Sequence, residues 1–256
     1  MIQVSAFLSN NMLKLKIYIS KFIRIFGYEV RRHPSTSYSV KEPFYHFRKL
    51  LDKQQPVIFD VGAHVGETIE QFRSSFPESY IHAFEPLDES FSILENRFQK
   101  TEKLFLNEVA IGNSLLSNSN MYVTQNKGSS SLLKPIEDAN QFWDENPLLT
   151  LKEIKVNTST IDSYCQKQNI KSIDILKIDV QGNEINVLKG AKQMLKEKRI
   201  KLIFTEISIA HNYEEQSEIE EVIKLLRVNK YKIFNFFKMK HNKGKLIECD
   251  VLFYAD

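Results

Sequence analysis

The pattern of apolar and polar positions predicts alternating strands and helices from residue 56 onward. Apolar runs at 57–61, 80–84 and 103–110 are typical of buried strands. Between them, apolar residues at helical spacing predict helices over 67–76 and 88–99. Such a βαβαβ alternation favours a parallel sheet that helices cover on both faces.

Residues 113–150 interrupt this alternation. They are rich in Ser and Asn, contain the only tryptophan, Trp143, and include a candidate strand at 121–124. A loop of this length in a compact domain is usually a lid or a binding loop, or is disordered. We therefore expect an insertion over 113–150 that folds over the sheet as a lid.

After the insertion the alternation resumes and then changes character. Helices are predicted over 160–168, 184–195 and 216–228, strands over 173–179 and 201–205, and a closing hairpin over 231–237 and 246–254. Five parallel strands followed by an antiparallel hairpin are the layout of the Rossmann-like class I methyltransferase fold. The sequence thus predicts an α/β domain with a seven-stranded, mostly parallel sheet in the order 3-2-1-4-5-7-6. A dinucleotide-binding domain would instead continue with parallel strands.

The N-terminal segment differs from the rest. Residues 12–32 carry six basic side chains and one acidic side chain among apolar residues. Two interpretations are open: a basic amphipathic helix that makes peripheral contact with a membrane or a partner, or a packing or dimerisation helix with a solvated basic face. We accordingly divide the chain into a helical extension, 1–55, and a methyltransferase domain, 56–256.

Composition limits the core size, the partners and the cellular compartment that we expect for the protein. With 256 residues, 42% of them hydrophobic, the chain can bury a sizeable core. A net charge of +3 is too small to argue for a nucleic-acid partner. The two cysteines, Cys165 and Cys249, lack metal-binding spacing and favour a reducing compartment. We expect a cytoplasmic protein, and peripheral membrane contact through 12–32 stays an open alternative.

A glycine turn closes the first predicted strand. Asp60, Gly62, Ala63 and Gly66 occupy it, with the spacing G-x-x-x-G rather than the dinucleotide G-x-G-x-x-G. Backbone N–H groups in such a turn can approach a nucleotide-like ligand closely. Asp60 would repel a pyrophosphate but suits the positive end of S-adenosylmethionine (SAM). We therefore expect this turn to bind that cofactor.

Two further strand ends complete the predicted cofactor site. Glu85 and Pro86 close the second strand, and Glu85 follows Gly66 by 19 residues, where a carboxylate can accept hydrogen bonds from ribose hydroxyls. Glu108 and Ala110, at the end of the third strand, are expected near the adenine edge. Because the glycine turn and Glu85 also suit NAD, an oxidoreductase stays a competing interpretation.

Candidate catalytic residues follow the fourth and fifth strands. Asp179 would face Gly62 across the crevice, where a carboxylate can orient an acceptor hydroxyl, act as general base or coordinate a cation. We also expect Asp179 among the residues that bind the cofactor. Glu184 and His211 are further candidates, with helix-dipole and solvated roles as their respective alternatives. Asp179 and Glu206 are a weak Mg²⁺ signature, so we assign no metal site.

Taken together, several motifs resemble the FkbM family of methyltransferases over about residues 56–210. These motifs are Phe59–Gly66, Ala83–Pro86, Val109–Gly112, Gly128–Leu132, Thr160–Asp162, Leu176–Glu184 and Val187–Ala191. The resemblance implies a SAM-dependent transferase that methylates a hydroxyl, often on sugars of surface polysaccharides or on secondary metabolites. It places Asp60, Gly62 and Glu85 at the cofactor and Asp179 at the reaction centre. Gln181 departs from the family, which often has Glu there.

Three other functions compete with this interpretation. They are a NAD-type oxidoreductase, a non-catalytic binding protein on the methyltransferase fold, and an RNA methyltransferase. The last rests only on the modest basic charge, since the sequence offers no aromatic and basic platform for RNA. The acceptor, a small molecule or a glycan, and the oligomeric state are left open by the sequence.

Overall fold

The computed structural model describes residues 43–143 and 146–255. The basic segment 12–32 lies outside the described residues. Residues Lys41–Asp256 group into one compact unit that contains the whole sheet. Within the described part of the chain, no helix has the length and apolar character needed to cross a membrane.

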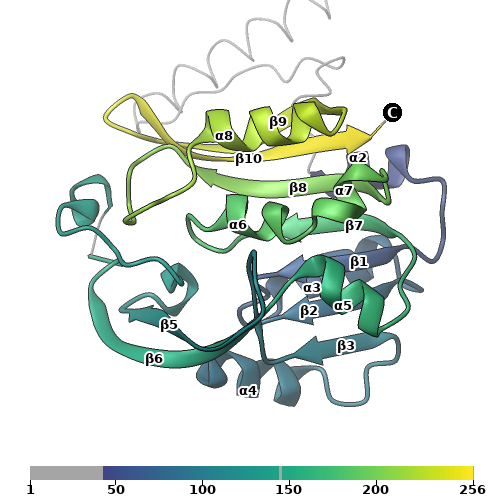
Figure 1. Ribbon diagram of the computed structural model, residues 1–256, viewed down its shortest axis with the longest axis horizontal. Helices are drawn as coiled ribbons and strands as arrows, with labels where there is room; N and C mark the ends of the chain where they lie inside the picture. The colour runs from purple at the N-terminus through teal and green to yellow at the C-terminus, as the bar shows by residue number, and fades with distance from the viewer. Residues whose placement is uncertain (1–42, 144–145, 256) are drawn as a thin grey trace, which may run out of the picture. The chain divides into compact units, whose positions relative to one another are not determined.

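A seven-stranded sheet in the order β3-β2-β1-β7-β8-β10-β9 forms the centre of this unit (Figure 1). Its strands are β1 (Val57–Val61), β2 (Tyr80–Phe84), β3 (Leu104–Asn107), β7 (Ile173–Ile178), β8 (Ile200–Ser208), β9 (Tyr231–Asn242) and β10 (Lys245–Ala255). The first five in sheet order pair in parallel, and β10 is antiparallel to both of its neighbours. The predicted order and the closing hairpin are confirmed.

Helices cover both faces of the sheet, as the alternation predicts. They are α2 (Pro43–Leu50), α3 (Glu67–Ser75), α4 (Asp88–Arg97), α5 (Ile161–Lys167), α6 (Glu184–Lys189), α7 (Lys192–Lys196) and α8 (Ile219–Val228). Neighbouring residues of β1 point to opposite cores: Ile58 packs with α2, α3 and α4, and Phe59 packs with α5 to α8. Helix α2 is part of the first core through the fully buried Phe47.

The helix predicted over 184–195 is divided into α6 and α7. Gly190 ends α6, and its carbonyl accepts the backbone N–H of Asp162 at 3.0 Å. The Asp162 carboxylate then accepts the N–H groups of Gln193 and Met194, at 2.8 and 3.0 Å. Because these are unpaired donors at the start of α7, a cap from a distant helix sets the break.

Residues 113–150, the expected insertion, belong to a second sheet, two of whose three strands lie wholly or mostly outside these bounds. Strands β4 (Ala110–Ile111), β5 (Leu116–Thr124) and β6 (Thr150–Ser159) form it in the order β4-β6-β5. The intervening residues include two short 3₁₀ helices, η2 (Lys127–Ser129) and η3 (Ala139–Phe142). The insertion is thus anchored by paired strands at both ends, which fixes the loops that it carries.

Candidate active site

A cavity of about 920 Å³ opens at the carboxyl ends of the parallel strands, where ligands bind in open α/β sheets. One wall comes from the strand ends of the main sheet and the other from the insertion. The residues that line the cavity include Gly62, Ala63, His64, Glu85, Pro86, Val109, Ala110, Ser129, Ser131, Trp143, Lys177, Asp179, Gln181, Glu206, Asn212, Lys240 and Glu248. The cavity therefore joins most of the predicted cofactor residues to the predicted catalytic Asp179.

The glycine turn builds the floor of the cavity. The backbone N–H groups of Gly62 and Ala63 both donate to the Phe84 carbonyl at 3.0 Å. Gly62 has a positive φ of 79°, and a Cβ there would lie 1.8 Å from the Asp179 carbonyl oxygen. Gly66, in contrast, contacts α4, because a Cβ on it would meet the Phe98 ring at 2.2 Å. Gly62 thus brings two strand ends together, while Gly66 serves helix packing.

Glu85 presents a carboxylate to the cavity from the end of β2. The side chain is buried, and its two oxygens each accept a backbone hydrogen bond, from His64 N and Leu87 N, at 2.9 Å. Burial raises the pKa of Glu85, and these hydrogen bonds oppose the rise. Anchoring both oxygens fixes the direction of the remaining lone pairs, as a ribose-binding carboxylate requires.

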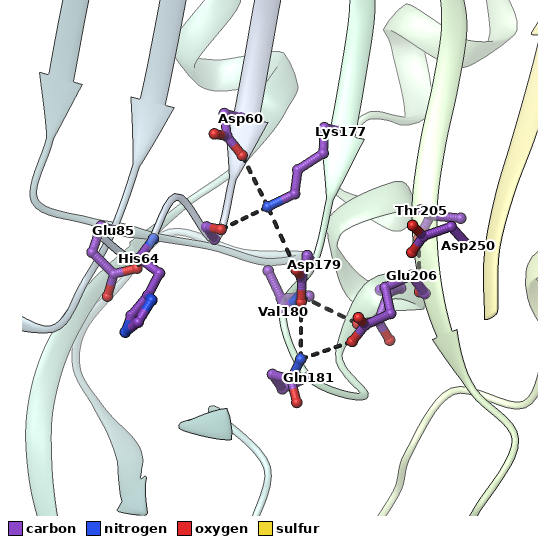
Figure 2. A network of polar contacts seen from close by, with 12 residues as sticks. Asp60, His64, Glu85, Lys177, Asp179, Val180, Gln181, Thr205, Glu206 and Asp250 are labelled. Carbon is purple, nitrogen blue, oxygen red and sulfur yellow. Dashed lines mark hydrogen bonds and ion pairs between the residues drawn. The ribbon is translucent and has the colours of Figure 1, made fainter. Parts of the chain in front are cut away.

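Asp60 is placed differently from the expectation that it faces the cofactor. It pairs in register with Lys177 on β7, is fully buried, and lies 2.9 Å from the Lys177 ammonium. That ammonium also donates to the Gly62 carbonyl at 2.7 Å and lies 3.6 Å from Asp179 (Figure 2). Burial opposes the charge on Lys177, but the two carboxylates outweigh it and raise its pKa. Asp60 therefore acts on the cavity through Lys177.

Asp179 stands at the centre of a cluster of carboxyl groups. The Gln181 side-chain amide donates to Asp179 Oδ1 at 2.9 Å and to Glu206 Oε1 at 2.8 Å (Figure 2). Burial, followed by the charges of Asp179 and of Glu248 and Asp250 on the hairpin, raises the pKa of Glu206 well above its usual range. The structure thus confirms that strand ends β7 and β8 converge, and adds Gln181 between them.

The structure moves two predicted catalytic residues away from the cavity. Glu184 is buried, and its Oε1 accepts the backbone N–H groups of Val180 and Gly182, at 3.3 and 3.1 Å, which makes it a local backbone acceptor. The side chain of His211 is 53% exposed and lies 3.8 Å from Glu218 on the surface. Both follow the predicted strands, but the turns after those strands direct them away from the reaction centre.

At the end of the third strand, only one of the two residues predicted to lie near the adenine lines the cavity. Glu108 is exposed to solvent, and the cavity is lined at this point by Val109, Ala110 and Ile111. Chain direction explains the difference, because β3 ends at Asn107 and the chain enters β4 at Ala110, which turns the apolar residues inward. Ala110 keeps its predicted place, and Glu108 does not.

Trp143, Asn212 and Lys240 line a further part of the same cavity. The Trp143 indole N–H donates to Asn212 Oδ1 at 2.9 Å, and the Lys240 ammonium lies 4.2 Å from the ring centroid. These residues come from the insertion, the loop after β8 and the hairpin. Their sequence separation explains why no local signal groups them, although the only tryptophan in an insertion was a hint.

No set of three or more metal-ligating side chains is found among residues 43–143 and 146–255. Asp179 and Glu206 were the carboxylates considered for Mg²⁺. The Gln181 amide donates to one oxygen of each.

The family comparison agrees with the fold. The model of the methyltransferase FkbM domain matches residues 60–233, and this chain belongs to that family of methyltransferases. A solved FkbM methyltransferase from Methylobacillus flagellatus shares the fold with a TM-score of 0.52 at 15% identity, over 80% of this chain. This chain spans only 45% of the length of that protein.

Curated relatives extend the comparison to named enzymes. The chain is 28% identical over 221 residues to the 2-O-methyltransferase NoeI of Sinorhizobium fredii, covering 83% of this chain and 86% of the relative. It is 25% identical over 181 residues to Methyltransferase 1 of Beauveria bassiana, covering 64% and 72%. These similarities do not favour the oxidoreductase or the non-catalytic interpretation.

Proposed function

We propose that this methyltransferase uses SAM and transfers its methyl group to a hydroxyl of a sugar-containing acceptor. The observation that carries the proposal is a single cavity with two chemically different ends. At one end, Glu85 offers a fixed carboxylate beside the glycine turn. At the other, the lining includes Asp179 and Glu206 together with Trp143 and Lys240. A cofactor and an acceptor can therefore meet between them.

The residues at the first end fit SAM. Glu85 would accept hydrogen bonds from the ribose hydroxyls, and Val109 and Ala110 would provide apolar contact for the adenine ring. Gly62 lets the ends of β1 and β7 approach closely at the floor of this cavity. SAM supplies an electrophilic methyl group on its sulfonium ion, so the protein needs no covalent intermediate of its own.

In this proposal Asp179 would accept the proton of the acceptor hydroxyl. Bound SAM would supply the methyl group and leave as S-adenosylhomocysteine, and the Asp179 carboxylate would take up the hydroxyl proton as the oxygen is methylated. The Lys177 ammonium lies 3.6 Å from this carboxylate. Alignment of the hydroxyl and removal of its proton are what methyl transfer to oxygen requires of an enzyme.

The outer wall favours a polyhydroxylated ring as the acceptor. Trp143 presents an aromatic surface whose edge is fixed by Asn212, and Ser129 and Ser131 add polar atoms along the insertion. Apolar ring faces and hydroxyl edges of a sugar match such a mixture of aromatic and hydrogen-bonding groups. A relative named for 2-O-methylation supports a hydroxyl acceptor.

The test is methyl transfer from ¹³C-methyl-SAM to a panel of mono- and oligosaccharides, read by NMR at the O-methyl position. We expect the wild type to methylate at least one neutral sugar. Asp179→Asn should lower kcat by about 10²-fold to 10⁴-fold, the usual contribution of a general base. Glu95→Gln, an exposed change on α4, is the matched control and should retain full activity. Absence of O-methyl signal across the panel, from folded wild type, would overturn the proposal.

A further inference from the structure

Gln181 joins two carboxyl groups that come from neighbouring strands. Its amide nitrogen carries two protons and donates one to Asp179 at 2.9 Å and one to Glu206 at 2.8 Å (Figure 2). Asp179 follows β7 and Glu206 belongs to β8, which pair in parallel. The full donor capacity of this amide is thus spent on the acidic side chains at the reaction centre.

The surroundings hold Gln181 firmly in this position. Its φ is +57°, a left-handed conformation that is uncommon for residues other than glycine and persists where neighbours enforce it. The hydroxyl of the buried Tyr213 lies 3.2 Å from Gln181 Oε1 and donates to the Ser129 carbonyl at 2.7 Å. The Ser131 hydroxyl donates to the Gln181 main-chain carbonyl at 2.8 Å. The insertion therefore helps to fix both the backbone and the side chain of Gln181.

The charges around Glu206 explain why a neutral donor suits this place. The acidic groups that act on Glu206 are Asp179, Glu248, Asp250 and Glu184, and the nearby cations are Lys177, Lys238 and Lys240. These lysines lie closest to other carboxylates, with Lys238 3.2 Å from Asp250 and Lys240 3.8 Å from Glu248. A third carboxyl group at position 181 would add repulsion, whereas an amide satisfies two carboxyl oxygens without changing the charge.

We propose that Gln181 is a positioning residue, whose amide holds the Asp179 and Glu206 carboxyl groups side by side and aims Asp179 at the acceptor hydroxyl. This inference rests on the proposed function for its catalytic consequence. We call the two hydrogen bonds from the Gln181 amide to Asp179 and Glu206 the clamp. The clamp is a property of the folded chain, because every contact that defines it lies within the protein. It assigns to an uncharged amide the bridging task that a cation performs in many carboxylate sites.

The first test measures the clamp without any acceptor. In protein with ¹³C-labelled Glu carboxyl groups, the pH titration of Glu206 is followed in the wild type and in Gln181→Met, which keeps side-chain length but removes both donors. Losing a hydrogen bond to the charged form should move the Glu206 midpoint upward by about half a pH unit or more. Gln166→Met, an exposed change on α5, should leave it in place. An unchanged midpoint in Gln181→Met would overturn the clamp, whatever the enzyme methylates.

The second test measures the catalytic consequence with an acceptor found in the methyl-transfer assay. Gln181→Met and Gln181→Glu should each lower kcat by about tenfold or more, while the KM for SAM changes by less than about threefold. Combining Gln181→Glu with Glu206→Gln transposes the amide and the acid, so this double variant should recover at least about fivefold over Gln181→Glu alone.

A check that each variant is folded provides the control for this second test. Each variant is compared only if its near-ultraviolet circular dichroism matches the wild type, and Gln181→Asn, a shorter amide, replaces any variant that does not fold. Wild-type kcat in the two single variants would overturn the positioning role. A loss of activity without recovery in the double variant would also contradict it, because a purely structural residue gives that pattern. A wild type that methylates nothing refutes the proposed function and leaves the carboxyl titration to decide on the clamp.

Discussion

Replacing Glu184 with Gln isolates the cost of burying one acid at the start of α6. The hydrogen bonds that Glu184 accepts from Val180 and Gly182 go to the same oxygen, Oε1. Glutamine can keep a carbonyl oxygen there and accept both. Burial raises the pKa of Glu184 to about 7, with the Asp179 charge adding to the rise and the backbone hydrogen bonds opposing it. Glu184→Gln therefore removes the titration and keeps the contacts.

The direction in which stability changes with pH depends on whether the folded or the unfolded chain binds the Glu184 proton more tightly. The ordinary pKa of 4.5 applies to the unfolded chain, and the folded value is about 7. The stabilising contribution of protonated Glu184 is therefore fully present below about pH 4.5, and it is lost as the pH rises through about 7. At about 1.4 kcal/mol for each tenfold change in proton affinity, the loss amounts to roughly 3 kcal/mol. Glu184→Gln has no carboxyl group to titrate at this position, so its free energy of unfolding does not show this loss.

The assay is urea unfolding followed by circular dichroism from about pH 5 to about pH 9. The free energy of unfolding of Glu184→Gln minus that of the wild type should rise by roughly 3 kcal/mol across this range. Glu95→Gln, exposed on α4, should give a flat difference. A flat difference for Glu184→Gln as well would refute the reasoning, because Glu184 would then ionise in the folded chain as it does in the unfolded one.

Two further variants test how the strand ends are held together. Gly62→Ala should lower the free energy of unfolding by more than about 3 kcal/mol, since the new Cβ would overlap the Asp179 carbonyl. Gly244 has a similar φ of 78°, but a Cβ there would have open space within the described part of the chain. Gly244→Ala should therefore cost only about 1 kcal/mol. Equal melting temperatures for the two variants would contradict the close approach. Lys177→Met should cost about 3–5 kcal/mol in urea unfolding, because it leaves the buried Asp60 carboxylate without its counter-ion. A loss below about 1 kcal/mol would show that this pair is not buried in solution.

The elements that the sequence predicts well are those set by local pattern. Apolar runs and helical spacing locate the parallel strands, and the Lys243–Gly244 turn, with φ values of 47° and 78°, marks the closing hairpin. The Gly62 turn and Glu85 were also predictable, because a strand followed by a glycine turn places both at one edge of the sheet. Local chemistry was sufficient in each of these cases.

The site residues that the structure places differently from the sequence-based expectation depend on strand register or on the path of a turn. Asp60 faces Lys177 because β1 and β7 pair in a register that no local pattern encodes. Glu184 binds backbone N–H groups of its own turn, which became visible only with the fold. Trp143 and Lys240 meet across the cavity from the insertion and the hairpin. Long-range register and loop paths, rather than residue type, decide these positions.

The most direct test of the account is calorimetric titration of the full chain with S-adenosylhomocysteine, the product form of the cofactor. We expect binding at one site per chain, weakened about 10-fold to 100-fold or more in Glu85→Ala, since each charge-assisted hydrogen bond to Glu85 contributes roughly 1.5–3 kcal/mol. Glu95→Gln should bind as the wild type does. Binding of NAD in place of S-adenosylhomocysteine and SAM, or binding that Glu85→Ala leaves unchanged, would contradict the assignment of this cavity as the cofactor site of a SAM-dependent methyltransferase.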